Sequence, residues 1–375
     1  RILRHPVTMA ILFNLAWMGV TMMTSSMHLV SIKFITARLW FVTVFYFLAT
    51  HLFKNFGNIK KFIWFYCIPF LAVIIYTVVR HAQNGFTQKT AHWVMIPFYN
   101  DHTAYAAALA MFIPLLLALS FDKAYSGTIR FYTFILFLVF VGALVLSYTR
   151  AAWMGIAAAA VFLIFLKLKI RFRTLLIATA CAGALAYIYR TELFLTLKKN
   201  KSNSSTDLAV HIKSISNVST DASNKERINR WKSALRMFEE RPFFGWGPGT
   251  YQFKYAPYQL RTEKTTISTN AGNRGNAHSE YIGPLAESGV LGSLSFLLIV
   301  LFIIARGMKV IYESKTREIR LLAKGILLGL ITYFVHGSMN NFLDTDKLSV
   351  PFWGMIAMLT ALDVYHNKTE KELKA

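Results

Sequence analysis

Residues 131–168 read FYTFILFLVFVGALVLSYTRAAWMGIAAAAVFLIFLKL. This stretch holds two apolar runs, Phe131–Tyr148 and Ala151–Leu168, and each is long enough for an α-helix to cross the hydrocarbon core of a bilayer. Between them stand Thr149 and Arg150 alone. The stretch therefore predicts two membrane-spanning helices that form a tight hairpin, with a cationic side chain at its tip.

Similar apolar runs recur on both sides of this pair. The chain has 375 residues, of which 55% are hydrophobic and 16% are charged, and the apolar ones are grouped in blocks of membrane-spanning length. The other predicted spans are Val7–Met23, Phe34–Phe53, Phe62–Val79, Thr103–Ser120, Leu175–Tyr189, Tyr281–Ala305, Leu321–His336 and Val350–Tyr365. We therefore expect an all-α, polytopic membrane protein of about ten transmembrane helices, and its first partner is the lipid bilayer.

The formal net charge of +23 follows the same pattern. Lys and Arg concentrate in alternate connections and in the two termini, as the positive-inside rule requires of cytoplasmic segments. No motif that pairs basic with aromatic residues is present, so nucleic acid is not expected as a partner. The remaining connections are then external: residues 24–33, 80–102, the turn at Arg150, 190–280 and 337–349.

The external segment 190–280 is too long for a simple connection, and we expect it to carry function. It divides the chain into helices 1–189, the loop 190–280, and helices with a cytoplasmic tail, 281–375. Lys198–Ala222 is rich in polar residues and predicts a mobile loop. Ser223 and Glu226 form a capping box that predicts an amphipathic helix ending at Arg241-Pro242, before three closely spaced glycines.

Both cysteines, Cys67 and Cys181, lie inside apolar runs, which predicts neither a disulfide framework nor a thiolate metal site.

Two arginines of the external connections are candidate ligands for an anion. Arg150 at the hairpin tip either extends to the membrane interface or binds a partner. Arg227 opposes the dipole in the first turn of the predicted amphipathic helix, which indicates an anionic ligand. An ion pair with Glu226, or exposure to solvent, is the alternative for Arg227.

His278 stands where the span Tyr281–Ala305 begins. A histidine there is either structural or the group that exchanges a proton near neutral pH. Glu280 or Glu287 could orient its ring, and Glu287, inside the span, requires a polar partner or a wet cavity.

Together these motifs resemble the O-antigen ligase superfamily, which also includes O-antigen polymerases. The resemblance rests on SYTR at 147–150, ERINRW at 226–231, RPFFGWGPG at 241–249, NAHSEY at 276–281 and LAESGVLG at 285–292. It covers about Phe131–Gly292; Pro97–Pro114 is similar to an upstream region of the family, and the first three spans agree in hydropathy alone. Because the family usually has about a dozen spans and this chain begins at Arg1, we expect N-terminal spans to be missing.

The resemblance implies transfer of a glycan from undecaprenyl diphosphate to a hydroxyl acceptor, with lipid A–core oligosaccharide as the leading acceptor. The reaction would take place at the periplasmic face of the bacterial inner membrane. Arg150 and Arg227 are then expected to bind the diphosphate, and His278 to act as general base. Further substrate-binding residues are expected at Arg230, Glu280, Glu287, Asp101 and His102. No cofactor and no metal ion are expected, since two guanidinium groups can stabilise the leaving diphosphate.

Three other activities stay open. Polymerisation of lipid-linked repeats and transfer to protein hydroxyls use the same donor chemistry within the superfamily. A glycolipid transporter is a different class, and it commonly places polar residues at mid-membrane in repeated halves. The polar residues here gather in the external connections, which favours an enzyme.

Overall fold

The computed structural model describes residues 1–200, 206–217, 220–269 and 275–367, and within these ranges all regular elements are helical. Nine helices of the described part are long and apolar enough to cross a membrane. A tenth crossing results if the bent pair α9 (Phe172–Ile188) and α10 (Arg190–Lys199) forms one span. The prediction of an all-α polytopic membrane protein with about ten spans is confirmed.

Three helices form the centre of the bundle: α6 (His102–Ser120), α15 (Arg317–His336) and α16 (Asp346–Ala361). Their residues are mostly buried. Glycines bring the helix backbones close together, because a Cβ on Gly329 would lie 2.3 Å from the Met111 carbonyl oxygen and one on Gly155 would lie 2.6 Å from that of Thr332. Such close backbone approach replaces the hydrophobic driving force that lipid surroundings remove.

The outer helices turn apolar side chains away from the centre. They are α1 (Pro6–Met23), α2 (His28–Val42) with its continuation to Leu52, α4 (Phe56–Gln83), α7 (Gly127–Leu146), α8 (Arg150–Lys167) and α9. Many of their large hydrophobic residues are exposed, among them Trp40, Phe65 and Phe131. A lipid-facing surface needs this composition.

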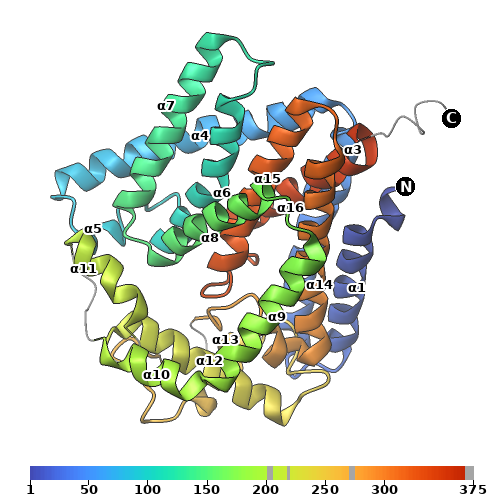
Figure 1. The fold of residues 1–375 in the computed structure, drawn as a ribbon. Helices are drawn as coiled ribbons and strands as arrows, with labels where there is room; N and C mark the ends of the chain where they lie inside the picture. Colours follow the sequence, from blue (N-terminus) through green and yellow to red (C-terminus); the bar gives the residue numbers. More distant parts are fainter. Residues whose placement is uncertain (201–205, 218–219, 270–274, 368–375) are drawn as a thin grey trace.

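The predicted hairpin is only partly correct. α7 and α8 are joined by Ser147–Thr149, as expected. The two helices then diverge, and α8 packs against α15 and α6 more than along α7 (Figure 1). The small side chains on α8, such as Ala152 and Gly155, account for this choice because they fit against α15.

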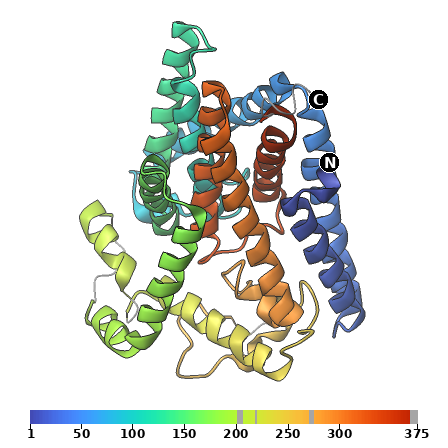
Figure 2. The same ribbon diagram turned by 45° about the vertical axis from the view of Figure 1, so that its right-hand side comes forward.

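The described residues of the segment 190–280, which we call the loop domain, gather at one end of the bundle, whereas the beginning of α1 and the end of α16 lie toward the other end (Figures 1 and 2). Its described helices are α10, α11 (Leu208–Lys213), α12 (Ala222–Glu240) and α13 (Tyr251–Lys254), with short turns at Ser214–Ser216 and Ala256–Tyr258. Lys198–Ala222 was expected to be a mobile loop. The structure instead places α11 and a 3-10 turn within it, and the Asn200 side chain donates to the Lys213 carbonyl (2.7 Å). Residues 201–205 and 218–219 of this prediction lie outside the described residues.

The short external connections meet the loop domain. Ser26 N donates to the Trp246 carbonyl (2.9 Å), and Arg227 Nε donates to the Met339 carbonyl (3.0 Å). The Tyr148 hydroxyl donates to the Phe86 carbonyl (3.2 Å). The connections predicted to share one side of the membrane therefore share one end of the structure.

Candidate active site

Arg150 begins α8, as the short turn predicts, but its guanidinium is already paired. Nη2 lies 2.9 Å from Asp221 Oδ1, Nη1 lies 3.1 Å from Asp221 Oδ2, and Nη1 also donates to Ser214 Oγ (2.8 Å). The Asp221 side chain is 4% exposed, so this is a bidentate, largely buried ion pair. The expectation of a guanidinium held ready for a diphosphate therefore needs revision at this residue.

The amphipathic helix α12 begins at Ala222, and its N-cap, Asp221, lies two residues before the predicted N-cap Ser223. Asp221 caps it, and its carboxylate accepts from Asn224 N (3.1 Å). The predicted capping box of Ser223 and Glu226 is wrong. Asp221 takes the capping role because Arg150 fixes its carboxylate at the helix end, and Glu226 instead pairs with Arg230 one turn along α12 (2.7 Å).

The charge of Arg227, unlike that of Arg150, is not offset by a carboxylate of the described residues. Nε donates to the Met339 carbonyl (3.0 Å) and Nη1 to Ser223 Oγ (2.8 Å), both of which are neutral acceptors. No carboxylate of the described residues lies within ion-pair distance of it, so the alternative pairing with Glu226 does not occur. Burial, with a further contribution from Arg150, lowers the pKa of Arg227 to about 10, and the side chain stays cationic at neutral pH.

Arg150 and Arg227 line one cavity of about 90 Å³, which we call the arginine cavity. Its other lining residues are Gln88, His92, His102, Thr103, Tyr148, Thr149, Ala151 and Ser223. The rings of His92 and His102 stack with centroids 4.2 Å apart, and His102 Nδ1 lies 3.4 Å from Asp101 Oδ1. Burial lowers the pKa of His92. The structure thus places His102 in the same cavity as the two arginines, with Asp101 beside it. His92 lies in the same external connection, and no motif in the sequence marks it as a lining residue.

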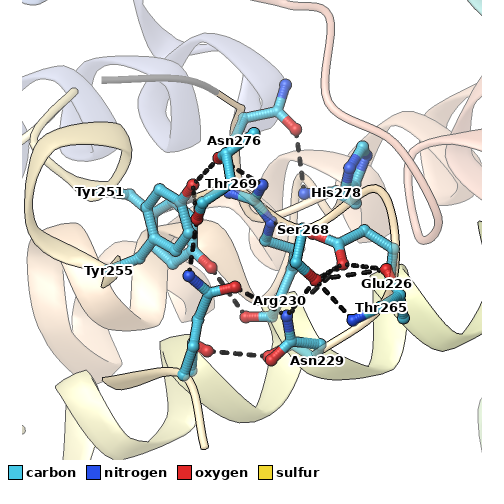
Figure 3. Close-up of polar contacts among 12 residues, drawn as sticks. Glu226, Asn229, Arg230, Tyr251, Tyr255, Thr265, Ser268, Thr269, Asn276 and His278 are labelled. Atoms are coloured by element: carbon cyan, nitrogen blue, oxygen red, sulfur yellow. Dashed lines mark hydrogen bonds and ion pairs between the residues drawn. The ribbon is translucent and has the colours of Figure 1, made fainter. Parts of the chain in front are cut away.

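His278 lies between Asn276 and the start of α14 (Gly283–Glu313), in a left-handed backbone conformation (φ 51°). Its N–H donates to Asn276 Oδ1 (3.0 Å), and its carbonyl accepts from Trp231 Nε1 (3.2 Å). Figure 3 shows the contact between the His278 N–H and Asn276. Both contacts hold the backbone, and the His278 ring makes no hydrogen bond with another described residue. Burial, then the positive charges of Arg227 and Arg230, lower the pKa of His278 to about 4, so its imidazole is neutral at physiological pH.

Neither predicted carboxylate orients the His278 ring. Glu280 Oε1 accepts from the Tyr333 hydroxyl (2.7 Å) and from Phe342 N (2.8 Å), and burial raises the pKa of Glu280. Glu287 Oε1 accepts from Tyr251 N (3.0 Å). These partners lie on α15, the following loop and α13, and their positions depend on packing that no local pattern predicts.

Arg230, expected to bind substrate, lies instead in a buried cluster of the loop domain. It pairs with Glu226 and lies over the Tyr255 ring (4.0 Å), while the Ser268 and Thr265 hydroxyls donate to Glu226 (Figure 3). Arg230 lines neither the arginine cavity nor the second cavity described below. Its place supports a role in holding α12 against Ser268 and Thr269.

The closely spaced glycines after α12 dock onto a break in α14. Gly289 has φ 67° and ψ −168°, which opens the helix and frees carbonyl groups of its first turns. Trp246 N donates to the Ala286 carbonyl (2.9 Å) and Gly247 N to that of Glu287 (2.8 Å). A Cβ on Gly245 would lie 2.4 Å from the Glu287 backbone, so the fit needs glycine there. This docking fixes Glu287 and the segment that carries His278.

Part of the chain matches a known protein family. Residues 134–297 match the O-antigen ligase family, a range that includes Arg150, Arg227 and His278. This segment of the chain is similar to the O-antigen ligase family.

A relative without an assigned function is an uncharacterized protein of Haemophilus influenzae, 26% identical over 257 residues. The alignment covers 67% of this chain, and the chain spans about 60% of the length of that relative. Asp101 and His102 precede the O-antigen ligase segment, so the arginine cavity is built from both the family segment and the helices before it.

Proposed function

We propose that this chain transfers a glycan from undecaprenyl diphosphate to a hydroxyl group of lipid A–core oligosaccharide at the periplasmic face of the bacterial inner membrane. One observation carries the proposal: Arg227, a half-buried cation without a carboxylate partner in the described chain, lines a polar cavity that is built partly from the O-antigen ligase segment.

The arginine cavity suits a diphosphate. Arg227 supplies an uncompensated positive charge, and guanidinium binds phosphate oxygens through paired N–H donors. Helices α8 and α12 both begin at the cavity, so the positive ends of their dipoles favour an anion there. His92 and His102 add ring nitrogens that can donate hydrogen bonds. The proposal therefore needs no divalent ion for the leaving group.

Arg150 acts in this proposal mainly as a positioning residue. Its two hydrogen bonds to Asp221 hold the cap of α12, and Arg227 lies in the second turn of that helix. Because Asp221 offsets the charge of Arg150, Arg227 makes the main contact with the donor.

His278 is the proposed general base. The acceptor oxygen attacks the anomeric carbon of the donor, the bond from that carbon to the diphosphate oxygen breaks, and the acceptor proton passes to the imidazole. The leaving diphosphate keeps the electron pair, and Arg227 stabilises the added charge. The ring is neutral at physiological pH and can therefore accept this proton.

The deciding experiment supplies purified protein with an undecaprenyl-diphosphate glycan and one acceptor at a time. We expect glycan on lipid A–core oligosaccharide, seen as a gel shift. Longer lipid-linked chains without that product would replace the proposal by a polymerase, and glycosylated protein would replace it by a protein O-oligosaccharyltransferase. Movement of the donor between vesicle leaflets without any new bond would indicate a transporter.

The periplasmic placement has its own test. In a background that lacks Cys67 and Cys181, a cysteine at Lys213 in the loop domain should react with an impermeant maleimide added to intact spheroplasts. A cysteine at Lys315, between α14 and α15, should react after lysis only. Reversed labelling would place the arginine cavity on the cytoplasmic side and contradict the proposal.

A further inference from the structure

A second, larger cavity lies beside the His278 segment and is not part of the arginine cavity. It measures about 260 Å³ and is lined from α2, the loop domain, the start of α14 and the loop after α15. An adjoining hollow of about 350 Å³ shares Phe34, Arg38, Gly249, Gln252 and Asp344 with it. We call the two together the Arg38 cavity.

Within the described chain, the charged groups that line the Arg38 cavity form no ion pair with one another. Arg38 and the carboxylates of Glu280, Glu287 and Asp344 all line it. Within the described chain, Arg38 lies within ion-pair distance of none of these carboxylates, and its recorded side-chain contact is with the Phe34 ring (5.6 Å). A guanidinium and three carboxylates that do not neutralise each other leave donors and acceptors available to a ligand.

Two of the carboxylates are held rigidly by hydrogen bonds. Glu280 is 7% exposed, and its Oε1 accepts from the Tyr333 hydroxyl and from the backbone N–H of Phe342 and Leu343. Glu287 Oε1 accepts from Tyr251 N. The second oxygen of Glu280 makes no hydrogen bond with another described residue, and the Glu287 carboxylate also accepts from the backbone of Gly249. Carboxylates fixed in this way are preorganised acceptors.

Asn341 provides an independent sign of a ligand. It lines the cavity, and its Oδ1 is buried without a hydrogen-bond partner in the described chain. A buried acceptor without a partner is costly, and such groups usually mark a site that another molecule completes. The Asn341 backbone carbonyl accepts from the Asn276 side chain (3.0 Å), which connects this wall of the cavity to the His278 segment.

The composition of the wall fits a sugar. A sugar hydroxyl both donates and accepts hydrogen bonds, and here carboxylates can accept while Arg38 and the amides of Asn276 and Gln252 can donate. The ring of Phe34, which lines both parts of the cavity, adds apolar surface for the C–H face of a pyranose. A diphosphate is disfavoured because three carboxylates would repel it, and an acyl chain is disfavoured by so many polar groups.

We propose that the Arg38 cavity binds the acceptor saccharide and presents its hydroxyl to His278, and this inference rests on the transferase function proposed above. The positions support the assignment. The Arg38 cavity is lined by Asn276, Ala277 and Glu280, which flank His278 in sequence. On the other side, Arg227 of the arginine cavity is the charged group that lowers the pKa of His278 most. The His278 segment therefore connects the two cavities, with donor diphosphate on one side and acceptor on the other.

The test compares Arg38→Met and Asp344→Asn with matched controls outside the cavity. The controls are Arg261→Met, an exposed arginine of the loop domain, and Asp346→Asn, two residues beyond Asp344 and also exposed. With donor saturating, we expect the KM for lipid A–core acceptor to rise at least tenfold in both cavity variants. Binding of undecaprenyl-diphosphate glycan should stay within twofold of the parent protein, and both controls should keep the parent KM.

A second readout separates this inference from the transferase function. Binding of deacylated core oligosaccharide is measured by saturation-transfer NMR, which needs no turnover. Transfer by the parent protein with an unchanged acceptor KM in both cavity variants would overturn the acceptor site alone. Equal loss of donor binding would assign the cavity to the donor glycan and also overturn it. A parent protein that binds the oligosaccharide through Arg38 but transfers nothing would remove the transferase function and keep the sugar site.

Discussion

Arg227→Ala should abolish most donor binding, and the structure gives a size for the loss. The guanidinium donates to the Met339 carbonyl and to Ser223 Oγ, and Nη2 has no hydrogen-bond partner among the described residues. It lines the arginine cavity with its positive charge not offset by a carboxylate. Alanine removes that charge and opens space in the cavity without leaving an unpaired acidic group behind.

The magnitude follows from the contact that is lost. A preorganised, charge-assisted contact to the leaving group contributes about 2–4 kcal/mol, so transfer should fall by about 30- to 1000-fold. Arg227→Lys should recover only part of this, because an ammonium is a point charge and lacks the Nε donor that reaches Met339. Loss of the Met339 contact should also lower the melting temperature by a few degrees in both variants.

The assay measures donor binding and transfer on monodisperse protein in detergent or nanodiscs. Lys225→Ala is the matched control, since it removes a cation from the same helix outside the arginine cavity. Near-parent donor affinity in Arg227→Ala, with a parent-like melting temperature, would refute the reasoning. A loss of equal size in Lys225→Ala would show that the general positive charge of the loop domain, not the cavity, binds the donor.

Four further outcomes are expected. His278→Gln should keep donor binding but lower turnover by about 10²–10⁴-fold. The pKa of His278 is about 4 in the folded protein and about 6.5 in the unfolded chain, so the unfolded chain binds the proton first and the parent protein loses up to about 3 kcal/mol of stability as the pH falls from 6.5 to 4. In a pH series of melting temperatures, the variant should lack this decrease. Arg150→Gln should destabilise the protein strongly, because it leaves the buried Asp221 carboxylate unpaired. The double variant Arg150→Gln with Asp221→Asn should recover much of the lost stability. A double variant that melts no higher than the single variant would argue against the buried pair. Gly245→Ala should cost about 1–3 kcal/mol because its Cβ meets the Glu287 backbone, while Gly183→Ala on α9 has open space and should be neutral in the same melting assay. Transfer should survive excess EDTA in the gel-shift assay, and activity lost to EDTA and restored by a divalent ion would redirect attention to Asp101 and His102.

The helices of this protein were readable from the sequence because span length is a local property. A run such as Phe131–Tyr148 is either long and apolar enough to cross a bilayer or it is not. The motifs around Arg150, Arg227 and His278 were readable for a similar reason, since each lies within a few residues of a helix end. The family match over residues 134–297 agrees with that interpretation.

Tertiary structure decided which of these residues carries an available charge. Arg150 and Asp221 are 71 positions apart, and no local pattern predicts that one neutralises the other. The same holds for Glu280, which contacts Tyr333 in place of His278, and for Arg38, which the sequence left unmarked within an apolar helix. Hydropathy fixes where helices form, but charge pairing and cavity walls depend on which helices pack together, and that is set by side-chain fit between segments far apart in the chain.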